Sequence, residues 1–411
     1  MEREHYYTHT LPNGLRIILQ HTTSQVAYSG YAVNAGTRDE DADNPGMAHF
    51  IEHMLFKGTE RRKAWHILNR MEHVGGDLNA FTNKEEMVVY CSFMQQDFPR
   101  AVELLTDLVF HSVFPEHEIE KEREVIIDEI KMYEDTPAEL IFDDFEDLIY
   151  SGHPLGRNIL GNEESLRGYG KQHADAFYHR YYRPDNMIFF VLGNFRLEQV
   201  VRQVERWTAG ISFPPVEMNR QQPPLIAPVR QQVCKQTHQA HVMIGGRAYN
   251  GQSSQRVALN LINNLLGGPG MNSRLNLALR EHRGLVYEIE SNYTPYTDTG
   301  TFSIYFGCDH EDAERCINLV EKELQLLCDH PLSDSQLRAA KKQLIGQIGV
   351  SSDNHESLAL GMAKTYLHYN RFVTSQEAFQ NIELLTASQL QQVAQEILSP
   401  PNLTTLMYVQ H

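Results

Sequence analysis

The chain has 411 residues, of which 41% are apolar and 22% charged, and its formal net charge is −17. This length exceeds what one hydrophobic core usually supports, so we expect a globular protein of two domains of roughly 200 residues each. The acidic balance argues against nucleic acid and anionic membrane surfaces as partners. The sequence shows no apolar run of about eighteen residues and no apolar leader, and its five scattered cysteines form no CxxC pair. We therefore expect no membrane partner and a cytoplasmic protein with reduced thiols.

Short strands alternate with helices in the first half of the chain. An Asn-Gly turn leads into a first strand that ends near Leu19, and a second strand is expected over residues 25–33. A helix should follow between the turn Asn44-Pro45-Gly46 and Gly58. The remaining predictions are helices over residues 64–74, 98–111, 116–134, 138–150 and 171–181, and strands over residues 78–82, 86–91 and 187–192.

Residues 213–228 are rich in proline and predict an extended linker. After this linker the order of elements recurs, with strands over 231–234, 241–247 and 299–306 and helices over 256–266, 311–328, 335–349 and 387–397. Both halves end on a Pro-Asp-Asn or Pro-Pro-Asn turn followed by an apolar strand. We therefore predict an α+β fold of two structurally similar domains, residues 1–212 and 229–411, each a mixed, largely antiparallel sheet covered by helices.

The helix after the first two strands carries the pattern His49-Phe50-Ile51-Glu52-His53. His49 and His53 are separated by one helical turn and share a face, so both imidazoles can bind one metal ion while Glu52 reaches a water on it. This is the H-x-x-E-H inverzincin pattern. A polar helix face with hydrogen-bonded histidines would give the same five residues, and the pattern by itself leaves both interpretations open.

A catalytic zinc site needs a third protein ligand. The helix expected over residues 116–134 offers Glu122 and Glu129, which share a face beside a stripe of Val125, Ile126, Ile127 and Ile130. A carboxylate beside a buried stripe is costly unless it is paired or binds a metal. An exposed acidic helix face explains the same residues, and helix geometry does not decide between the two. The helix over 256–266 contains no His or Glu, so only the first half can bind metal in this way.

The chain resembles the pitrilysin / insulin-degrading enzyme / mitochondrial processing peptidase family of zinc metallopeptidases, most of all its short bacterial members similar to the processing-peptidase β subunit. The resemblance covers essentially the whole chain. It rests on residues 11–15 (LPNGL), 34–40 (NAGTRDE), 49–59 (HFIEHMLFKGT), 79–82 (NAFT), 122–129 (EREVIIDE) and 280–287 (REHRGLVY).

The resemblance implies a zinc metalloendopeptidase, a peptide-bond hydrolase that holds one Zn²⁺ per chain and acts on short or unfolded peptides. The third ligand in the family lies about 76 residues after the second histidine, which selects Glu129 to complete the site with His49 and His53. Glu122 would support the site without binding the metal. Glu52 would be the general base for the zinc-activated water.

The resemblance also implies a substrate-binding edge strand at Asn79, Ala80, Phe81 and Thr82, and catalytic roles for Arg280 and Tyr287. Without it, the strand would be an ordinary hairpin strand and the pair a surface arginine and a half-buried aromatic. Longer relatives place this pair opposite the zinc of another domain, so we predict a homodimer whose active sites are shared between subunits. Residues 267–270 (GGPG) lack the ending of a phosphate loop and are expected to shape the domain around the pair. The alternative function is that of a non-catalytic core or peptide-capturing subunit.

Overall fold

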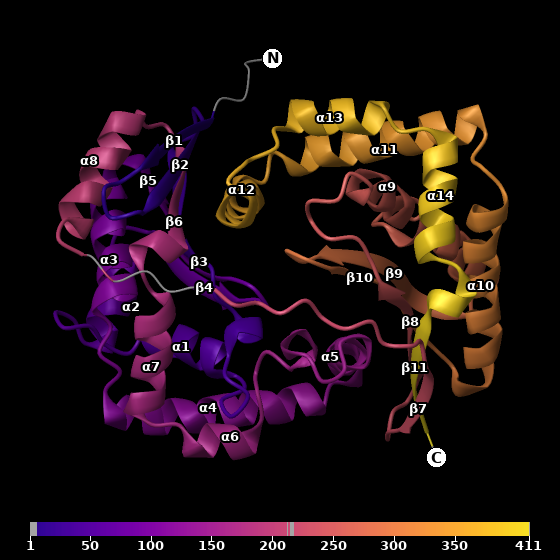
Figure 1. Ribbon diagram of the computed structural model, residues 1–411, viewed down its shortest axis with the longest axis horizontal. Helices are drawn as coiled ribbons and strands as arrows, with labels where there is room; N and C mark the ends of the chain where they lie inside the picture. The colour runs from indigo at the N-terminus through magenta and orange to yellow at the C-terminus, as the bar shows by residue number, and fades with distance from the viewer. Residues whose placement is uncertain (1–5, 212, 214–217, 411) are drawn as a thin grey trace. The chain divides into compact units, whose positions relative to one another are not determined.

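The computed structural model describes residues 6–211, 213 and 218–410, in which the strands form two sheets (Figure 1). The first sheet has the order β1-β2-β6-β3-β5-β4. Within it β2 and β6 are parallel, and every other neighbouring pair is antiparallel. Its strands are β1 Tyr6–Thr10, β2 Arg16–His21, β3 Val26–Val33, β4 Asp77–Thr82, β5 Met87–Met94 and β6 Met187–Gly193.

The second sheet has the order β7-β11-β8-β10-β9 and repeats the first one without its outermost strand. The pair β7 and β11 is parallel, as β2 and β6 are, and the remaining pairs are antiparallel. The strands are β7 Arg230–Cys234, β8 Ala240–Arg247, β9 Val286–Pro295, β10 Gly300–Cys308 and β11 Thr404–Val409. The fold class is therefore the predicted one, two similar α+β arrangements of largely antiparallel sheet.

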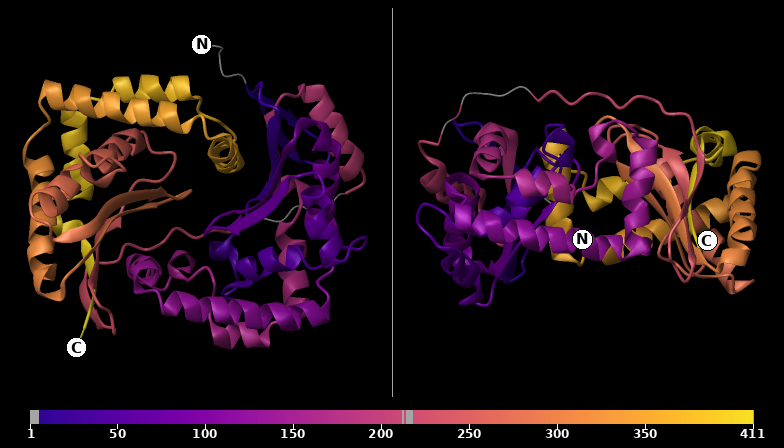
Figure 2. Two further views of the ribbon diagram at one scale, coloured as in Figure 1. Left: turned by 180° about the vertical axis from the view of Figure 1, so that it is seen from behind. Right: turned by 90° about the horizontal axis from the view of Figure 1, so that it is seen from below.

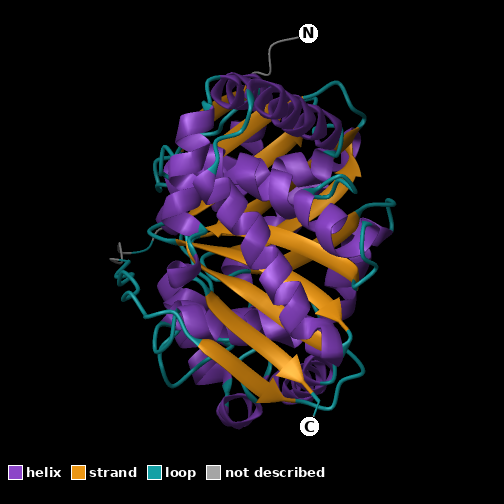
Figure 3. Cartoon of the chain, turned by 90° about the vertical axis from the view of Figure 1, so that its right-hand side faces the viewer, coloured by secondary structure: helices purple, strands orange, loops and turns teal. Residues whose placement is uncertain are grey.

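The described helices lie across the faces of these sheets (Figure 3). In chain order they are α1 Met47–Leu55, α2 Ala64–Glu72, α3 Phe98–His111, α4 Glu116–Glu134, α5 Pro137–Ile149, α6 Glu163–Gly168, α7 Lys171–Tyr181, α8 Leu197–Thr208, α9 Arg256–Gly267, α10 Ala313–Asp329, α11 Asp334–Ser351, α12 His355–Tyr369, α13 Ser375–Glu383 and α14 Ala387–Ile397. No described helix is both long enough and apolar enough to cross a bilayer.

Both faces of the first sheet are buried, because side chains alternate between the faces along each strand. Phe189 and Val191 of β6 join the core beneath α1 and α3, whereas Ile188 and Phe190 join a second core with Ala363 of α12. Helices α3 and α12 thus contact opposite faces of this sheet (Figure 2). This two-sided burial explains why β6 is an unbroken apolar run rather than an alternating one.

The second sheet is covered in the same way. One core joins β8 and β10 to α9, α10 and α14, and the other joins Met243 and Tyr408 to Ile141 and Phe145 of α5. Tyr150, at the end of α5, donates or accepts a hydrogen bond with Thr301 of β10 at 2.8 Å. A helix that precedes the linker therefore closes a face of the sheet that follows it.

The two compact units consequently differ from a simple division at the linker. One contains the described residues of 1–131, 157–220 and 350–375, and the other those of 132–156, 221–349 and 376–410. The physical reason is burial, because α5 and α12 each bury an apolar face on the sheet of the other half of the sequence. The predicted linker over 213–228 lies partly outside the described residues, since residues 214–217 are not described.

Most predicted elements are present with boundaries shifted by a few residues. The motif helix is shorter than the turn signals suggested and spans Met47–Leu55. Several elements had no counterpart in the sequence-based expectations, among them α6, α8, α12, α13 and the edge strand β9. The repeat is confirmed in topology, because α9 follows β8 as α1 follows β3.

Candidate metal centre

Helix α1 presents His49, Glu52 and His53 on one side because its apolar residues occupy the other. Phe50, Met54 and Leu55 are completely buried in the core of the first unit. The imidazoles of His49 and His53 lie with ring centroids 4.6 Å apart. The apolar face thus fixes the rotation of α1, and that rotation places both histidines beside α4.

Three side chains converge at this point. Glu129 Oε2, from α4, lies 3.9 Å from His49 Nε2 and 3.8 Å from His53 Nε2. These separations are too long for hydrogen bonds but close to the ~3.4 Å expected between ligands that each lie ~2.1 Å from a tetrahedral zinc. Among the described residues, this is the one group of three or more His, Cys, Asp or Glu side chains arranged to hold a metal ion. The donor set of two imidazoles and a carboxylate fits zinc.

His49 is held in the form that binds metals. Burial, followed by the charge of His53, lowers the pKa of His49 to about 3. Its imidazole is therefore neutral near pH 7, as a metal ligand must be. His49 Nδ1 is buried and has no hydrogen-bond partner among the described residues. A histidine that is only a satisfied part of a polar face would have such a partner, so the orphaned nitrogen argues against that alternative.

His53 is oriented by a carboxylate on its far side. Glu122 Oε2 lies 3.1 Å from His53 Nδ1, and Glu122 Oε1 lies 2.6 Å from Lys57 Nζ. Burial alone would raise the pKa of Glu122, but the contacts with His53 and Lys57 outweigh it and hold that pKa below its ordinary value. An ionised Glu122 accepts a hydrogen bond from Nδ1–H of His53 and leaves Nε2 facing Glu129, which is the arrangement typical of metal-binding histidines. Sequence reasoning did not identify Lys57.

Glu52 lies on the same helix with a different environment. Its Oε2 accepts a hydrogen bond of 2.6 Å from Thr82 Oγ1 of β4. Burial raises the pKa of Glu52, Thr82 and His53 lower it, and Glu129 raises it again, with a net rise. No described residue hydrogen-bonds to Oε1, so one carboxylate oxygen remains available to exchange a proton.

The start of α1 is fixed by a second buried carboxylate that sequence reasoning missed. Glu40 accepts hydrogen bonds from the backbone N–H groups of Gly46 (2.9 Å) and Ala48 (2.8 Å), two of the unpaired donors at the helix N-terminus. Gly46 adopts a φ of +88° and packs against Gly161, whose φ is +75°. A Cβ on Gly161 would lie 2.2 Å from the carbonyl oxygen of Pro45. The sequence signal for the capping role of Glu40 was an acidic residue shortly before the predicted helix.

The predicted substrate strand is an edge strand. Asn79, Ala80, Phe81 and Thr82 all belong to β4, which pairs on one side with β5 and is the last strand of its sheet. An edge strand has unpaired backbone N–H and C=O groups along its free side. The hydrogen bond from Thr82 ties this strand to Glu52, so the free edge and the metal-binding residues form one region.

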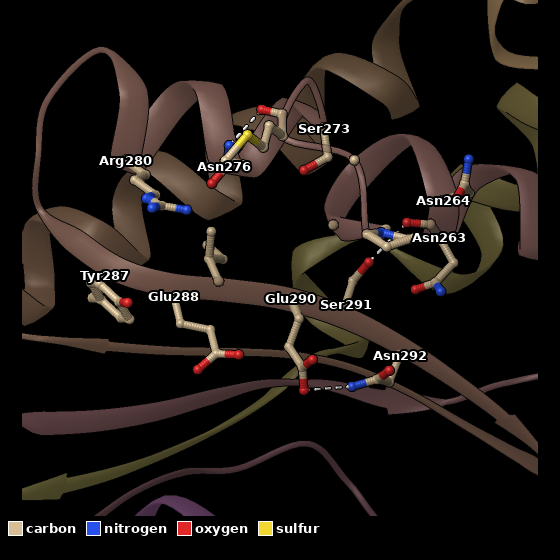
Figure 4. A pocket seen from close by; sticks show the side chains of 16 residues that line it. Asn263, Asn264, Ser273, Asn276, Arg280, Tyr287, Glu288, Glu290, Ser291 and Asn292 are labelled. Atoms are coloured by element: carbon tan, nitrogen blue, oxygen red, sulfur yellow. Dashed lines mark hydrogen bonds between the residues drawn. The ribbon is translucent and has the colours of Figure 1, made fainter. Parts of the chain in front are cut away.

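Arg280 and Tyr287 lie together in the other compact unit. Arg280 belongs to a short π-helical turn, η5 Asn276–Glu281, and Tyr287 to the edge strand β9. The Arg280 guanidinium lies 5.6 Å from the centroid of the Tyr287 ring, which is 80% exposed. Both line a cavity of about 560 Å³ (Figure 4). Gly267, Gly268, Pro269 and Gly270 line the same cavity.

Known proteins match this chain along almost its entire length. Residues 16–163 match the family model "Insulinase (Peptidase family M16)", and residues 170–344 match "Peptidase M16 inactive domain". The uncharacterized zinc protease YmxG of Bacillus subtilis is 30% identical over 393 residues, which cover 95% of each chain. The chain belongs to peptidase family M16. An uncharacterized zinc protease of Streptomyces coelicolor is also 30% identical, covering 95% of this chain and 86% of its own.

Solved structures share the M16 fold. A protease from Helicobacter pylori superimposes with a TM-score of 0.92 at 21% identity, covering 99% of this chain and 100% of its own. An M16 inactive-domain protein from Pseudomonas fluorescens superimposes with a TM-score of 0.92 at 18% identity, covering 99% of this chain and 98% of its own. The segment that matches the inactive-domain model includes α9, which has no His or Glu. Within the described residues, the candidate metal-binding group thus lies in the first unit of this M16 protein.

Proposed function

We propose that this M16 protein is a zinc-dependent endopeptidase that hydrolyses short or unfolded peptides. The observation that carries the proposal is the convergence of His49 Nε2, His53 Nε2 and Glu129 Oε2. Glu52 lies half-buried beside them, close enough for the charges of His53 and Glu129 to affect its pKa. The names of its relatives as zinc proteases support the same reaction. Bound zinc would supply the Lewis acidity that makes water a nucleophile near neutral pH and polarises the scissile carbonyl.

The protein's own groups account for the proton movements. Glu52 Oε1 takes a proton from the attacking water and later delivers it to the leaving amine. Thr82, through its hydrogen bond to Oε2, holds the Glu52 carboxylate in one orientation while Oε1 reacts. Because Thr82 ends the edge strand β4, a peptide paired with that strand would run past Glu52. Pairing of this kind needs an extended backbone, which favours short or unfolded substrates.

The reaction also needs a hydrogen-bond donor for the oxyanion that develops on the scissile carbonyl. We assign this role to Tyr287, whose exposed hydroxyl can donate a hydrogen bond, and assign to Arg280 the binding of substrate backbone. In the proposed homodimer, each pair serves the metal centre of the other subunit.

The direct test is the Glu52→Gln variant. It should bind zinc as the wild type does, because Glu52 is not a ligand, and it should lose about 10²- to 10⁴-fold in cleavage of a quenched fluorescent peptide. Zinc content by elemental analysis and turnover by fluorescence give the two readouts. Glu124→Gln, on the exposed face of α4, is the matched control and should keep both.

Loss of metal provides the complementary result. His49→Ala and Glu129→Ala should each lose zinc together with activity, and o-phenanthroline should abolish wild-type turnover. Wild-type turnover in zinc-loaded Glu52→Gln would contradict the assignment of the base. A wild-type protein that binds zinc and peptides but never cleaves them would favour the alternative, a peptide-capturing subunit of the same family.

A further inference from the structure

A second cavity in the first unit lies apart from the metal centre. It has a volume of about 350 Å³ and lies where α2 meets α3. None of the residues that line it is a candidate for metal binding or catalysis. The lining residues are Arg61, Arg62, Trp65, His66, Asn69, Arg70, His73 and Arg100. Four arginines in one small cavity are unusual in a chain whose net charge is −17.

Carboxylates neutralise only part of this positive charge. Arg62 forms ion pairs with Glu103 and Asp107, and Arg70 shares Glu103 at 3.1 Å. Arg100 has one carboxylate partner, Asp97, at 4.0 Å. The Arg61 side chain has no ion-pair or hydrogen-bond partner among the described residues. The cavity therefore retains a cationic character at Arg61 and Arg100.

His66 offers the cavity a further hydrogen-bond donor. His66 Nδ1 accepts a hydrogen bond of 3.4 Å from the backbone N–H of Lys63, so Nε2 carries the proton and is a donor. This N–H donor and the guanidinium groups of Arg61 and Arg100 together fit an oxyanion such as a phosphate.

The same cavity offers a flat apolar surface. Trp65 is 58% exposed, and its ring lies on that of His66 with centroids 3.9 Å apart at an interplanar angle of 31°. An exposed indole beside guanidinium groups is suited to stacking with a planar ring. The volume falls within the range of small-molecule sites.

We propose that this cavity binds a nucleoside phosphate, with the base stacked on Trp65 and the phosphate held by Arg61 and Arg100. The arginines favour an anionic group and the exposed ring of Trp65 favours a planar one. A ligand with only one of these parts would leave the other feature of the cavity without a partner. An acidic protein segment would satisfy the arginines but would leave the exposed indole unexplained.

The test uses the fluorescence of Trp65. The chain has two tryptophans, so Trp207→Phe leaves Trp65 as the sole indole. Titration with AMP should quench this signal saturably, whereas adenosine and inorganic phosphate should each bind at least about tenfold more weakly, because each lacks one of the two interactions. Adding Arg61→Ala should weaken AMP binding about tenfold or more, and the control Arg315→Ala, at an exposed ion pair of the other unit, should leave it unchanged.

Three results would overturn the proposal. Equal affinity for AMP and inorganic phosphate would remove the role of Trp65. If the Arg61→Ala variant, shown to be folded by circular dichroism, binds AMP as tightly as the parent Trp207→Phe protein, Arg61 does not hold the phosphate. Binding of polyglutamate in place of AMP would assign the cavity to an acidic protein partner instead.

Discussion

The two histidines of the metal centre have different surroundings although they lie one helical turn apart. His53 has Glu122 and, through it, Lys57 behind the ring, whereas Nδ1 of His49 has no partner among the described residues. The orientation of His53 is therefore set by a charged network and that of His49 by packing alone. Substitutions in the network should act on metal affinity through His53.

Glu122→Gln tests this network. The amide keeps the shape of the side chain but removes the charge that stabilises the Nδ1–H tautomer of His53, so zinc affinity should fall about 10- to 100-fold. Competition with a chromophoric chelator measures the change. Glu120→Gln, on the exposed face of the same helix, should leave the affinity unchanged. If Glu122→Gln binds zinc like the wild type, the network has no bearing on the metal.

The sequence could predict which residue types meet at the candidate metal centre. It could not predict which nitrogen of His53 each glutamate would contact. Glu122 and Glu129 are two turns apart on one face of α4, so helix geometry treats them alike. Only packing against α1 brings Glu122 to Nδ1 of His53 and Glu129 to Nε2. Lys57 escaped notice because its pairing depends on α4, which the local pattern does not contain. Glu40 lies shortly before the helix that it caps, so its local signal was present and was overlooked.

At the scale of elements, α1 depends on the close approach of two backbones at its start. In Gly161→Ala, the added Cβ would meet the carbonyl oxygen of Pro45 at 2.2 Å in a left-handed conformation, so the chain around Gly46 must move. We expect a loss of about 2 kcal/mol in the free energy of unfolding together with weaker zinc binding. Urea denaturation and chelator competition measure the two effects.

Gly152→Ala provides the control for this prediction. Gly152 has a similar φ of +74°, but a Cβ there would have no atom within 4 Å. Gly152→Ala should therefore lower the free energy of unfolding without weakening zinc binding. If Gly161→Ala and Gly152→Ala bind zinc with equal affinity, the packing of residues 160–161 does not influence the metal centre.

Helix α12 is tied to the first sheet by a buried charge cluster. Glu86, at the start of β5, lies 2.9 Å from both His368 and Lys364. Burial alone would raise the pKa of Glu86, but the hydrogen bond from His368 and the charge of Lys364 outweigh it and lower the pKa from 4.5 to about 2. Because the folded pKa is depressed, the stabilisation is complete above pH 4.5 and is lost as the pH falls towards 2.

Acid denaturation should reveal this cluster. Its loss should remove roughly 3 kcal/mol of the free energy of unfolding between pH 5 and pH 2, and Glu86→Gln should be less stable at pH 7 and lose less in acid. Urea unfolding at several pH values tests this. Glu163→Gln, which breaks an exposed pair with Arg167, should leave the pH dependence of stability almost unchanged. If the free energy of unfolding of Glu86→Gln falls with pH as steeply as that of the wild type, the cluster is not the cause of the acid sensitivity.

The elements that sequence reasoning placed least well are those whose partners lie far along the chain. The apolar face of α5 shows that the helix must pack, but nothing local shows that its partner is the sheet formed after the linker. The same holds for α12, which reaches back to β3 and β6. Strand β9 was missed because its polar, partly exposed residues break the apolar alternation on which the prediction relied.

For the molecule as a whole, the repeat makes the two units alike in topology and different in chemistry. Strands β4 and β9 occupy the same edge position in their sheets. In the first unit this edge adjoins the candidate metal-binding residues, and in the second it carries Tyr287 beside Arg280. The duplicated fold therefore carries a candidate metal centre in one unit and an exposed hydrogen-bond donor in the other.

In the proposed homodimer, each active site would combine the candidate metal centre of one subunit with Tyr287 of the other. Glu52→Gln and Tyr287→Phe should each be inactive alone, because the first lacks the base and the second the donor to the oxyanion. If the donor comes from the other subunit, a mixed dimer contains one site with both groups intact. Free exchange of subunits at equal amounts should then restore roughly a quarter of wild-type activity. The assay is peptide cleavage after co-incubation, with exchange followed by pull-down of differently tagged chains.

A mixture of Glu52→Gln with His49→Ala serves as the control, because both substitutions damage the same unit and no arrangement of subunits restores it. Activity in this control would point to contamination or reversion rather than to shared sites. If tagged chains exchange but Glu52→Gln and Tyr287→Phe give no activity together, Tyr287 acts within its own subunit. Full activity of Tyr287→Phe alone would instead remove the tyrosine from the reaction and leave the stabilisation of the oxyanion to zinc and the groups of the first unit.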